Sequence, residues 1–141
     1  MSMQEGWAVE SLVETVSSPL LAGVEAIEAA LEEMAGADPL FLGAEAKGAL
    51  LLRLARLETR LVAVRLRVMA VCDEVALAEG ARDVAALVTH HTRTEAGANR
   101  RDLALAQALD LRWHLVAAAL SAGEVNLAQA HVITHALEEL P

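Results

Sequence analysis

Asn99, Arg100 and Arg101 form a cluster of side chains that could bind nucleic acid, and Arg93 lies six residues before it. A guanidinium group binds phosphate oxygens or a guanine edge through two parallel hydrogen bonds, and an asparagine amide pairs with adenine. We therefore interpret Arg93, Asn99, Arg100 and Arg101 as candidate nucleic-acid contacts. The alternative is that Arg100 and Arg101 belong to an ordinary solvated helix face beside Asp102.

His131 and His135 stand four residues apart, a spacing that places two imidazoles on one face of a helix. Two such histidines can share a zinc ion, and Glu138 follows one turn later. Position 132 is valine where the helical motif of zinc proteases has glutamate, and the spacing supplies no third ligand. His131 and His135 are kept as candidate ligands only, and we expect neither a metal nor another cofactor.

Catalytic chemistry finds no support in the residue pattern. The sequence has no glycine-rich phosphate loop, no nucleophile elbow and no paired carboxylates at a recognisable spacing. Its single cysteine, Cys72, excludes a disulfide within the chain and a zinc site built from several cysteines. We expect a noncatalytic protein without a small-molecule substrate.

The composition indicates which elements hold these side chains. Hydrophobic residues make up 55% of the 141 residues, yet the aromatic side chains are only Trp7, Phe41 and Trp113, so leucine, valine and alanine must form the core. Leucine, alanine, glutamate and arginine favour helices because they lose little side-chain freedom there. We predict an all-α, multi-helical fold with one long central helix, at about residues 44–79, and a series of shorter packed helices.

Gly36-Ala37-Asp38-Pro39 is the clearest break in the helical pattern. Glycine permits unusual backbone angles, and the residue before a proline is pushed out of the helical region. The break divides the sequence into acidic N-terminal helices in residues 1–38 and a helical domain in residues 39–141. The first part has a weak helical pattern over residues 5–18 and a second helix that runs to about Met34.

A helix-turn-helix outline positions the candidate nucleic-acid contacts. Asp83 can cap a short helix at about residues 84–91, residues 91–93 form a tight connection, and a second helix follows from Thr94 to at least Leu109. The three contiguous candidates at 99–101 then lie in the N-terminal half of the second helix, where such motifs contact bases. Further helices are predicted at about residues 113–121, ended by Gly123, and at 126–140, capped by Asn126.

The predicted long helix carries a heptad repeat. Its apolar positions recur in alternating steps of four and three, at Leu50, Leu54, Leu57, Leu61, Val64, Val68, Val71 and Val75. Additional apolar residues, Leu52, Leu66 and Met69 among them, widen this surface and favour packing against the chain's own helices. A homodimer through the 50–75 helix stays the alternative interpretation.

The net charge of −9 is unevenly distributed. Residues 1–59 carry ten acids and three bases, whereas residues 80–115 carry four acids and five bases. An acidic protein repels phosphate at long range, so a DNA contact has to rest on a local patch. No stretch reaches the ~20 charge-free apolar residues that span a bilayer, and the N-terminus does not read as a signal peptide. We expect a cytoplasmic protein with no membrane partner.

Several ordered motifs carry a family resemblance. They are Gly80-Ala81-Arg82-Asp83-Val84-Ala85-Ala86-Leu87-Val88, Thr92-Arg93-Thr94, Ala98-Asn99-Arg100-Arg101, Leu105-Ala106, Ala117-Ala118-Ala119-Leu120-Ser121-Ala122-Gly123-Glu124-Val125, Gln129-Ala130-His131-Val132-Ile133 and Leu140-Pro141. Together they resemble the actinobacterial domain of unknown function 222, also called the 13E12 repeat family. The resemblance covers most of residues 44–141.

The resemblance implies that the helical domain precedes a C-terminal HNH endonuclease domain, which binds metal and cuts phosphodiesters. The sequence lacks the cysteine pairs and the His-Asn-His arrangement of that domain, and His90-His91 do not supply them. We therefore expect this chain to be a fragment or truncated product, with the nuclease domain beyond residue 141. The leading prediction is a noncatalytic helical module that contacts DNA or positions the nuclease. The alternative is a structural or oligomerisation module that uses the heptad-patterned helix.

Overall fold

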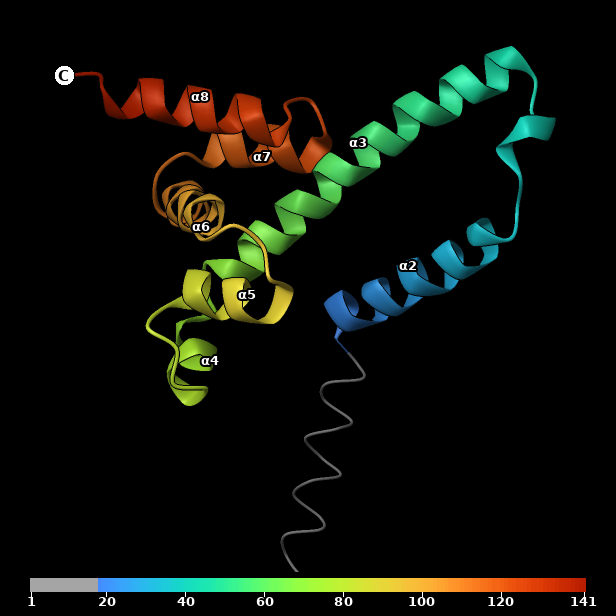
Figure 1. Ribbon diagram of the computed structural model, residues 1–141. Helices are drawn as coiled ribbons and strands as arrows, with labels where there is room; N and C mark the ends of the chain where they lie inside the picture. Colours follow the sequence, from blue (N-terminus) through green and yellow to red (C-terminus); the bar gives the residue numbers. More distant parts are fainter. Residues whose placement is uncertain (1–17) are drawn as a thin grey trace, which may run out of the picture. The chain divides into compact units, whose positions relative to one another are not determined.

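The computed structural model describes residues 18–141, and this part of the chain contains helices and no strand. Figure 1 shows its α-helices, which are α2 (Pro19–Ala35), α3 (Ala44–Met69), α4 (Asp73–Ala78), α5 (Val84–Thr92), α6 (Ala96–Leu111), α7 (His114–Ala122) and α8 (Leu127–Glu138), and a short 3-10 helix, η1 (Pro39–Phe41). The predicted all-α, multi-helical fold is confirmed. Apart from Ser18, the helical pattern predicted over residues 5–18 lies outside the described residues.

The described residues divide into two compact units, one ending at Lys47 and the other spanning residues 48–141. The boundary falls inside α3, after Lys47, whereas the sequence pattern places a boundary after Asp38. The two boundaries differ because a break in helical propensity marks only where the chain changes direction. The structural boundary instead lies where the packing density changes.

In the first unit, α2 begins at Pro19, whose fixed φ suits the first turn of a helix. Asp38 caps η1, because its Oδ1 accepts a hydrogen bond from the Leu40 amide at 2.9 Å. The predicted break at Gly36 to Pro39 is therefore present. None of the α2 residues is buried, and its exposed large apolar side chains are Leu20, Leu21, Val24, Ile27, Leu31 and Met34.

The long central helix ends at Met69 rather than near residue 79. The amides of Val71 and Cys72 bond three residues back, to the carbonyls of Val68 at 3.1 Å and Met69 at 3.3 Å, and α4 then begins at Asp73. No glycine or proline marks this break, so local propensity alone permits a continuous helix. Tertiary packing overrides it: a straight helix would carry Ala76 roughly 10 Å past Met69, whereas in the structure Ala76 is buried in the same core.

α3 packs on the other helices of residues 48–141 through one face and carries the heptad seam on another. Its buried residues are Ala63, Leu66 and Met69. At about 100° per residue, Leu57, Leu61 and Val68 lie roughly 140–180° around the helix from Leu66. These three side chains are 50%, 48% and 43% exposed. The chain's own helices thus cover Leu66 and Met69 of the additional apolar residues, whereas Leu52 is 73% exposed. This differs from the predicted packing of the seam itself.

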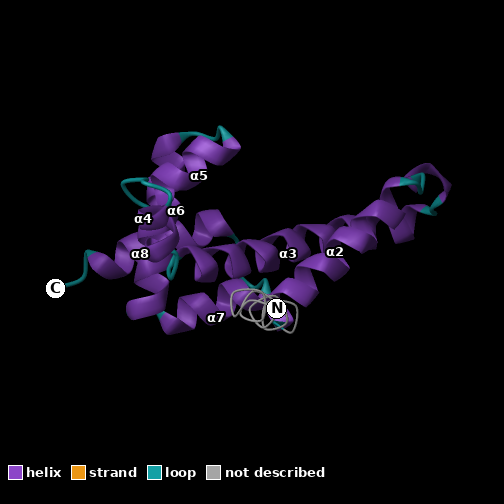
Figure 2. Ribbon diagram, turned by 90° about the horizontal axis from the view of Figure 1, so that it is seen from below, coloured by secondary structure: helices purple, strands orange, loops and turns teal. Residues whose placement is uncertain are grey.

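α6 is the central element of residues 48–141. Its buried residues are Asn99, Leu103, Leu105, Ala106, Ala108 and Leu109. Figure 1 looks along the axis of α6, with α5 on one side and α7 and α8 on the other, and Figure 2 shows the same helices gathered around the C-terminal part of α3. Small side chains at Ala63, Ala85, Ala106 and Ala130, all buried, allow the helices to approach closely, and Leu66 and Leu120 fill the space between them.

The predicted caps fix the ends of the later helices. The Ala86 amide donates to Asp83 Oδ1 at 2.8 Å at the start of α5, and Asn126 forms a capping box with Gln129 at the start of α8. Gly123 ends α7 with a φ of 76°, and a Cβ atom there would lie 2.5 Å from Arg56 Cγ on α3. Only glycine fits this turn, because both its backbone angle and its contact exclude a side chain.

No single helix of residues 18–141 is long and apolar enough to cross a membrane, and α6 and α7 meet that criterion only as a pair bent by 113°.

Candidate nucleic-acid interface

The turn between α5 and α6 holds Arg93 in an unusual backbone conformation. Arg93 follows the last residue of α5 and has φ 55° and ψ 31°, in the left-handed region. Within residues 18–141, every other residue with a positive φ is a glycine. The conformation lets the Arg93 amide donate to the Thr89 carbonyl at 2.9 Å and closes the helix. The Arg93 side chain is left exposed on the turn.

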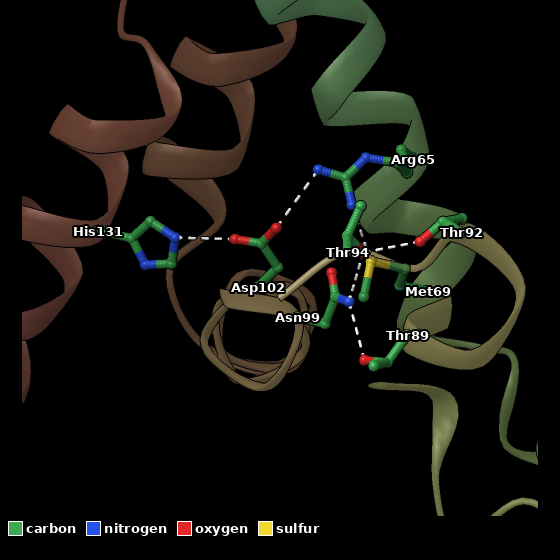
Figure 3. A network of polar contacts seen from close by, with 8 residues as sticks. All are labelled: Arg65, Met69, Thr89, Thr92, Thr94, Asn99, Asp102 and His131. Carbon is green, nitrogen blue, oxygen red and sulfur yellow. Dashed lines mark hydrogen bonds and ion pairs between the residues drawn. The ribbon is translucent and has the colours of Figure 1, made fainter. Parts of the chain in front are cut away.

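Asn99, on α6, bonds to threonines of α5 and of the turn (Figure 3). Its amide nitrogen lies 2.9 Å from Thr89 Oγ1 and 2.8 Å from Thr94 Oγ1. Thr89 donates its only hydroxyl proton to the Ala85 carbonyl at 2.7 Å, so it accepts from Asn99. The amide group therefore points its nitrogen, and not its oxygen, at Thr89.

The second amide proton of Asn99 starts a short chain of hydrogen bonds. Thr94 accepts this proton, and its hydroxyl lies 2.7 Å from Thr92 Oγ1. Thr92 in turn donates to the Val88 carbonyl at 2.7 Å, so Thr94 is the donor to Thr92. Every proton in the chain has an acceptor, and a fully satisfied network of this kind rigidifies the turn.

The burial of Asn99 changes its interpretation. The residue is only 6% exposed, and both amide protons are used within the protein. The sequence interpretation of Asn99 as a direct base contact does not fit this geometry. Its partners lie five and ten residues earlier in the chain, so residue type alone did not identify them. The threonines at 89, 92 and 94 were the sequence signal for a local hydrogen-bond network, because threonine hydroxyls readily bond nearby backbone groups.

The arginines of the candidate site point outward. Arg93 and Arg100 are exposed, and neither forms an ion pair with another residue of 18–141. Arg101 lies 3.5 Å from Glu95, with the two side chains 68% and 69% exposed. An ion pair as exposed as this one contributes little to stability, so Arg101 is also free to bind another anion.

Glu95 caps the N-terminus of α6. Its carboxylate accepts from the amides of Gly97 at 2.7 Å and Ala98 at 2.6 Å. The hydrogen bonds from Gly97 and Ala98, followed by the charges of Arg101 and Arg100, lower the pKa of Glu95. The carboxylate thus occupies the amides at this end of α6.

Asp102 ties α6 to α3 and α8 (Figure 3). Its Oδ2 lies 3.4 Å from Arg65 Nη2, and its Oδ1 lies 3.1 Å from His131 Nε2. Its side chain is 14% exposed. Asp102 therefore pairs with Arg65, not with Arg100 or Arg101. Sequence reasoning missed this contact because the partners lie 37 and 29 residues away.

The two candidate zinc ligands have separate partners. His131 faces Asp102, whereas His135 lies 3.8 Å from Glu139 and is largely exposed. In the part of the chain that the structure describes, no three histidine, cysteine, aspartate or glutamate side chains are placed to hold a metal ion. His131 and His135 thus each contact an acidic side chain of the protein itself, Asp102 and Glu139.

A known protein family matches most of the chain. The family described as a domain of unknown function (DUF222) matches residues 48–141, which are the second compact unit and contain Arg93, Arg100 and Arg101. No curated protein and no solved structure matches the chain. Because the matched segment covers more than half of the chain, the protein belongs to the DUF222 family.

Proposed function

We propose that residues 48–141 form a noncatalytic module that contacts nucleic acid through α5, the turn and the exposed face of α6. The contacts are Arg93, Arg100 and Arg101, and Asn99 holds the turn that presents them. The single observation that carries the proposal is the left-handed backbone conformation of Arg93, at a position where glycine is normally preferred. Strained residues of this kind cluster at functional sites.

The charge and shape of this surface suit a phosphate backbone. Residues 82–101 contain four arginines and two acids, in a chain whose net charge is −9. The exposed face of α6 continues from Arg100 through Ala104 to Gln107, so a small side chain follows the arginines. Small side chains let a backbone or groove approach the helix, and guanidinium groups bind phosphate oxygens bidentately.

The family resemblance suggests what such a contact serves. Where a DUF222-type module is joined to an HNH endonuclease domain, this surface would hold DNA while the attached domain cuts it. The module itself would supply binding and positioning only. This part of the proposal rests on the resemblance and on the exposed arginines together.

The test is equilibrium binding of the full chain to a fluorescent DNA duplex over a salt series. Each phosphate contact releases about 0.9 counterion, so losing one contact weakens binding roughly eightfold at 0.1 M salt. The Arg93→Ala, Arg100→Ala variant should therefore bind roughly 60-fold more weakly. Arg53→Ala, Arg60→Ala is the matched control, because it removes two exposed arginines of α3. Absence of binding by the wild-type chain, or an equal loss in both variants, contradicts the proposal.

A second candidate function is homodimerisation through the heptad seam of α3. Leu57, Leu61 and Val68 are about half exposed and lie on the face of α3 away from its buried residues. Light scattering of the wild-type chain should then report a dimer, and Leu57→Gln, Leu61→Gln should report a monomer. Leu115→Gln, an 88% exposed leucine on α7, is the control. A wild-type monomer at high concentration would remove this candidate.

A further inference from the structure

A cavity beside the turn brings Arg100 together with two residues that sequence reasoning did not single out as contacts. It has a volume of about 320 Å³ and lies between α5 and the first turns of α6. Arg82, from the loop before α5, and His90, from the end of α5, line it together with Arg100 of α6. Residues with nitrogen-bearing side chains from three segments thus line one hollow, and all three are exposed.

The polar groups of the cavity differ in whether their hydrogen-bonding atoms are already engaged within the protein. Thr89 Oγ1 donates its only proton to the Ala85 carbonyl, so it has no donor left for an anion. Asp83 is the only acid of the lining, and its Oδ1 is engaged as the cap of α5. Arg82 and Arg100 form no ion pair within residues 18–141. The available groups are therefore two guanidinium donors and one imidazole.

The remaining wall is made of small side chains. Ala85, Ala86 and Ala96 line the cavity, so no bulky group competes for the space between the arginines. A guanidinium group can present two parallel N–H donors, so two of them lining one hollow can bind several oxygens of a tetrahedral oxyanion.

We propose that this cavity seats a phosphate group, held by Arg82 and Arg100 with His90 as a further donor. The inference rests on the proposed function, in which the phosphate belongs to a nucleic-acid backbone whose neighbouring phosphates meet Arg93 and Arg101. It adds Arg82 and His90 to the interface, and it assigns Arg100 to phosphate rather than to a base edge. A free phosphate is the other source of the same chemistry, and the experiment separates the two.

The first arm titrates the ¹⁵N-labelled full chain with inorganic phosphate and follows the side-chain Nε–Hε signals of its arginines. Signals of Arg82 and Arg100 should shift in a saturable way, whereas that of Arg60, exposed on α3, should not. Shifts of equal size at all arginines, or none, overturn the cavity as a phosphate site. This arm does not depend on DNA binding.

The second arm measures duplex binding by Arg82→Gln against the matched control Arg60→Gln. Arg82→Gln should lose roughly eightfold in affinity at 0.1 M salt and lower the slope of log K against log salt by about 0.9. Arg82→Lys should recover part of the affinity, because it restores the charge without the two-pronged donor. His90→Gln serves as a second variant should Arg82→Gln alter the thermal unfolding curve.

The two proposals fail in different ways. If Arg93→Ala, Arg100→Ala weakens duplex binding while Arg82→Gln and His90→Gln match Arg60→Gln, the nucleic-acid contact stands and the cavity proposal is overturned. If inorganic phosphate shifts Arg82 and Arg100 but no duplex binds, the phosphate site stands and its assignment to a nucleic-acid backbone is overturned. Shifts with phosphate and a selective loss in Arg82→Gln support both.

Discussion

Replacing Arg93 by glycine should make the protein more stable and a weaker nucleic-acid binder. Arg93 has φ 55°, and a left-handed conformation costs an ordinary L-residue about 1–2 kcal/mol. Glycine removes this cost but adds freedom to the unfolded chain, worth about 0.4–1 kcal/mol in the other direction. The hydrogen bond from residue 93 to the Thr89 carbonyl is a backbone bond and is kept. The net stabilisation expected is about 0.5–1 kcal/mol.

Thermal unfolding and duplex binding measure the two effects separately. For a chain of this size, 0.5–1 kcal/mol raises the midpoint of thermal unfolding by about 2–4 °C. Loss of one phosphate contact should weaken duplex binding roughly eightfold at 0.1 M salt and lower the salt slope by about 0.9. Arg93→Lys keeps both the charge and the strained backbone, so its stability should match the wild type and its affinity should stay close to it.

Gly123→Ala is the reciprocal control. It places a side chain at φ 76° and against Arg56, so it should lower stability without touching the arginines of the turn. A fall in the unfolding midpoint of Arg93→Gly would refute the argument about backbone strain. A rise in the midpoint with unchanged duplex affinity would refute the assignment of Arg93 as a contact. The backbone strain at residue 93 would then exist without serving nucleic-acid binding.

Three further predictions concern the support of the site. Leu66→Ala removes one of the two largest fully buried side chains and should cost about 3–5 kcal/mol in urea unfolding; a cost below 1 kcal/mol would contradict the assigned core. Asn99→Ala removes two hydrogen bonds, to Thr89 and Thr94, each worth about 0.5–1.5 kcal/mol, and should cost about 1–3 kcal/mol by the same measurement; no loss would contradict the network. Glu95 has a folded-state pKa below its ordinary 4.5, so its stabilisation is present above that pH and is lost as the pH falls through the lowered value. Glu95→Gln should therefore show a smaller loss of stability on acidification than the wild type, and parallel pH profiles would contradict the cap.

Local sequence signals were sufficient where a helix end depends on neighbouring residues. Asp83, Gly123 and Asn126 were predicted as a cap, a stop and a cap, and the structure places each in that role. The end of α3 was predicted wrongly, because every residue from Ala70 to Glu79 is compatible with a helix. There the burial of Ala76 in the core decides the backbone, and a local pattern carries no record of such packing.

The candidate site shows the same division. Arg93, Arg100 and Arg101 were located from their residue types and their place around a turn, and all three side chains are exposed. Asn99 has the same side-chain chemistry whether it faces DNA or the interior, so the sequence did not decide between the two. Its direction depends on Thr89 and Thr94, which only the packing of α5 against α6 brings within reach.

The excess of acids over the whole chain explains why the rigidity of this turn matters. With a net charge of −9, the protein gains little from long-range attraction to phosphate, so binding depends on a few arginines held in place. Fixing flexible groups before binding reduces the entropy lost on association. Asn99→Ala should therefore weaken duplex binding although Asn99 touches no phosphate, and it should leave the salt slope unchanged because no charge is removed. Arg93→Gly should instead reduce the slope. If the two variants alter the slope equally, Asn99 acts through a lost contact rather than through the placement of the arginines.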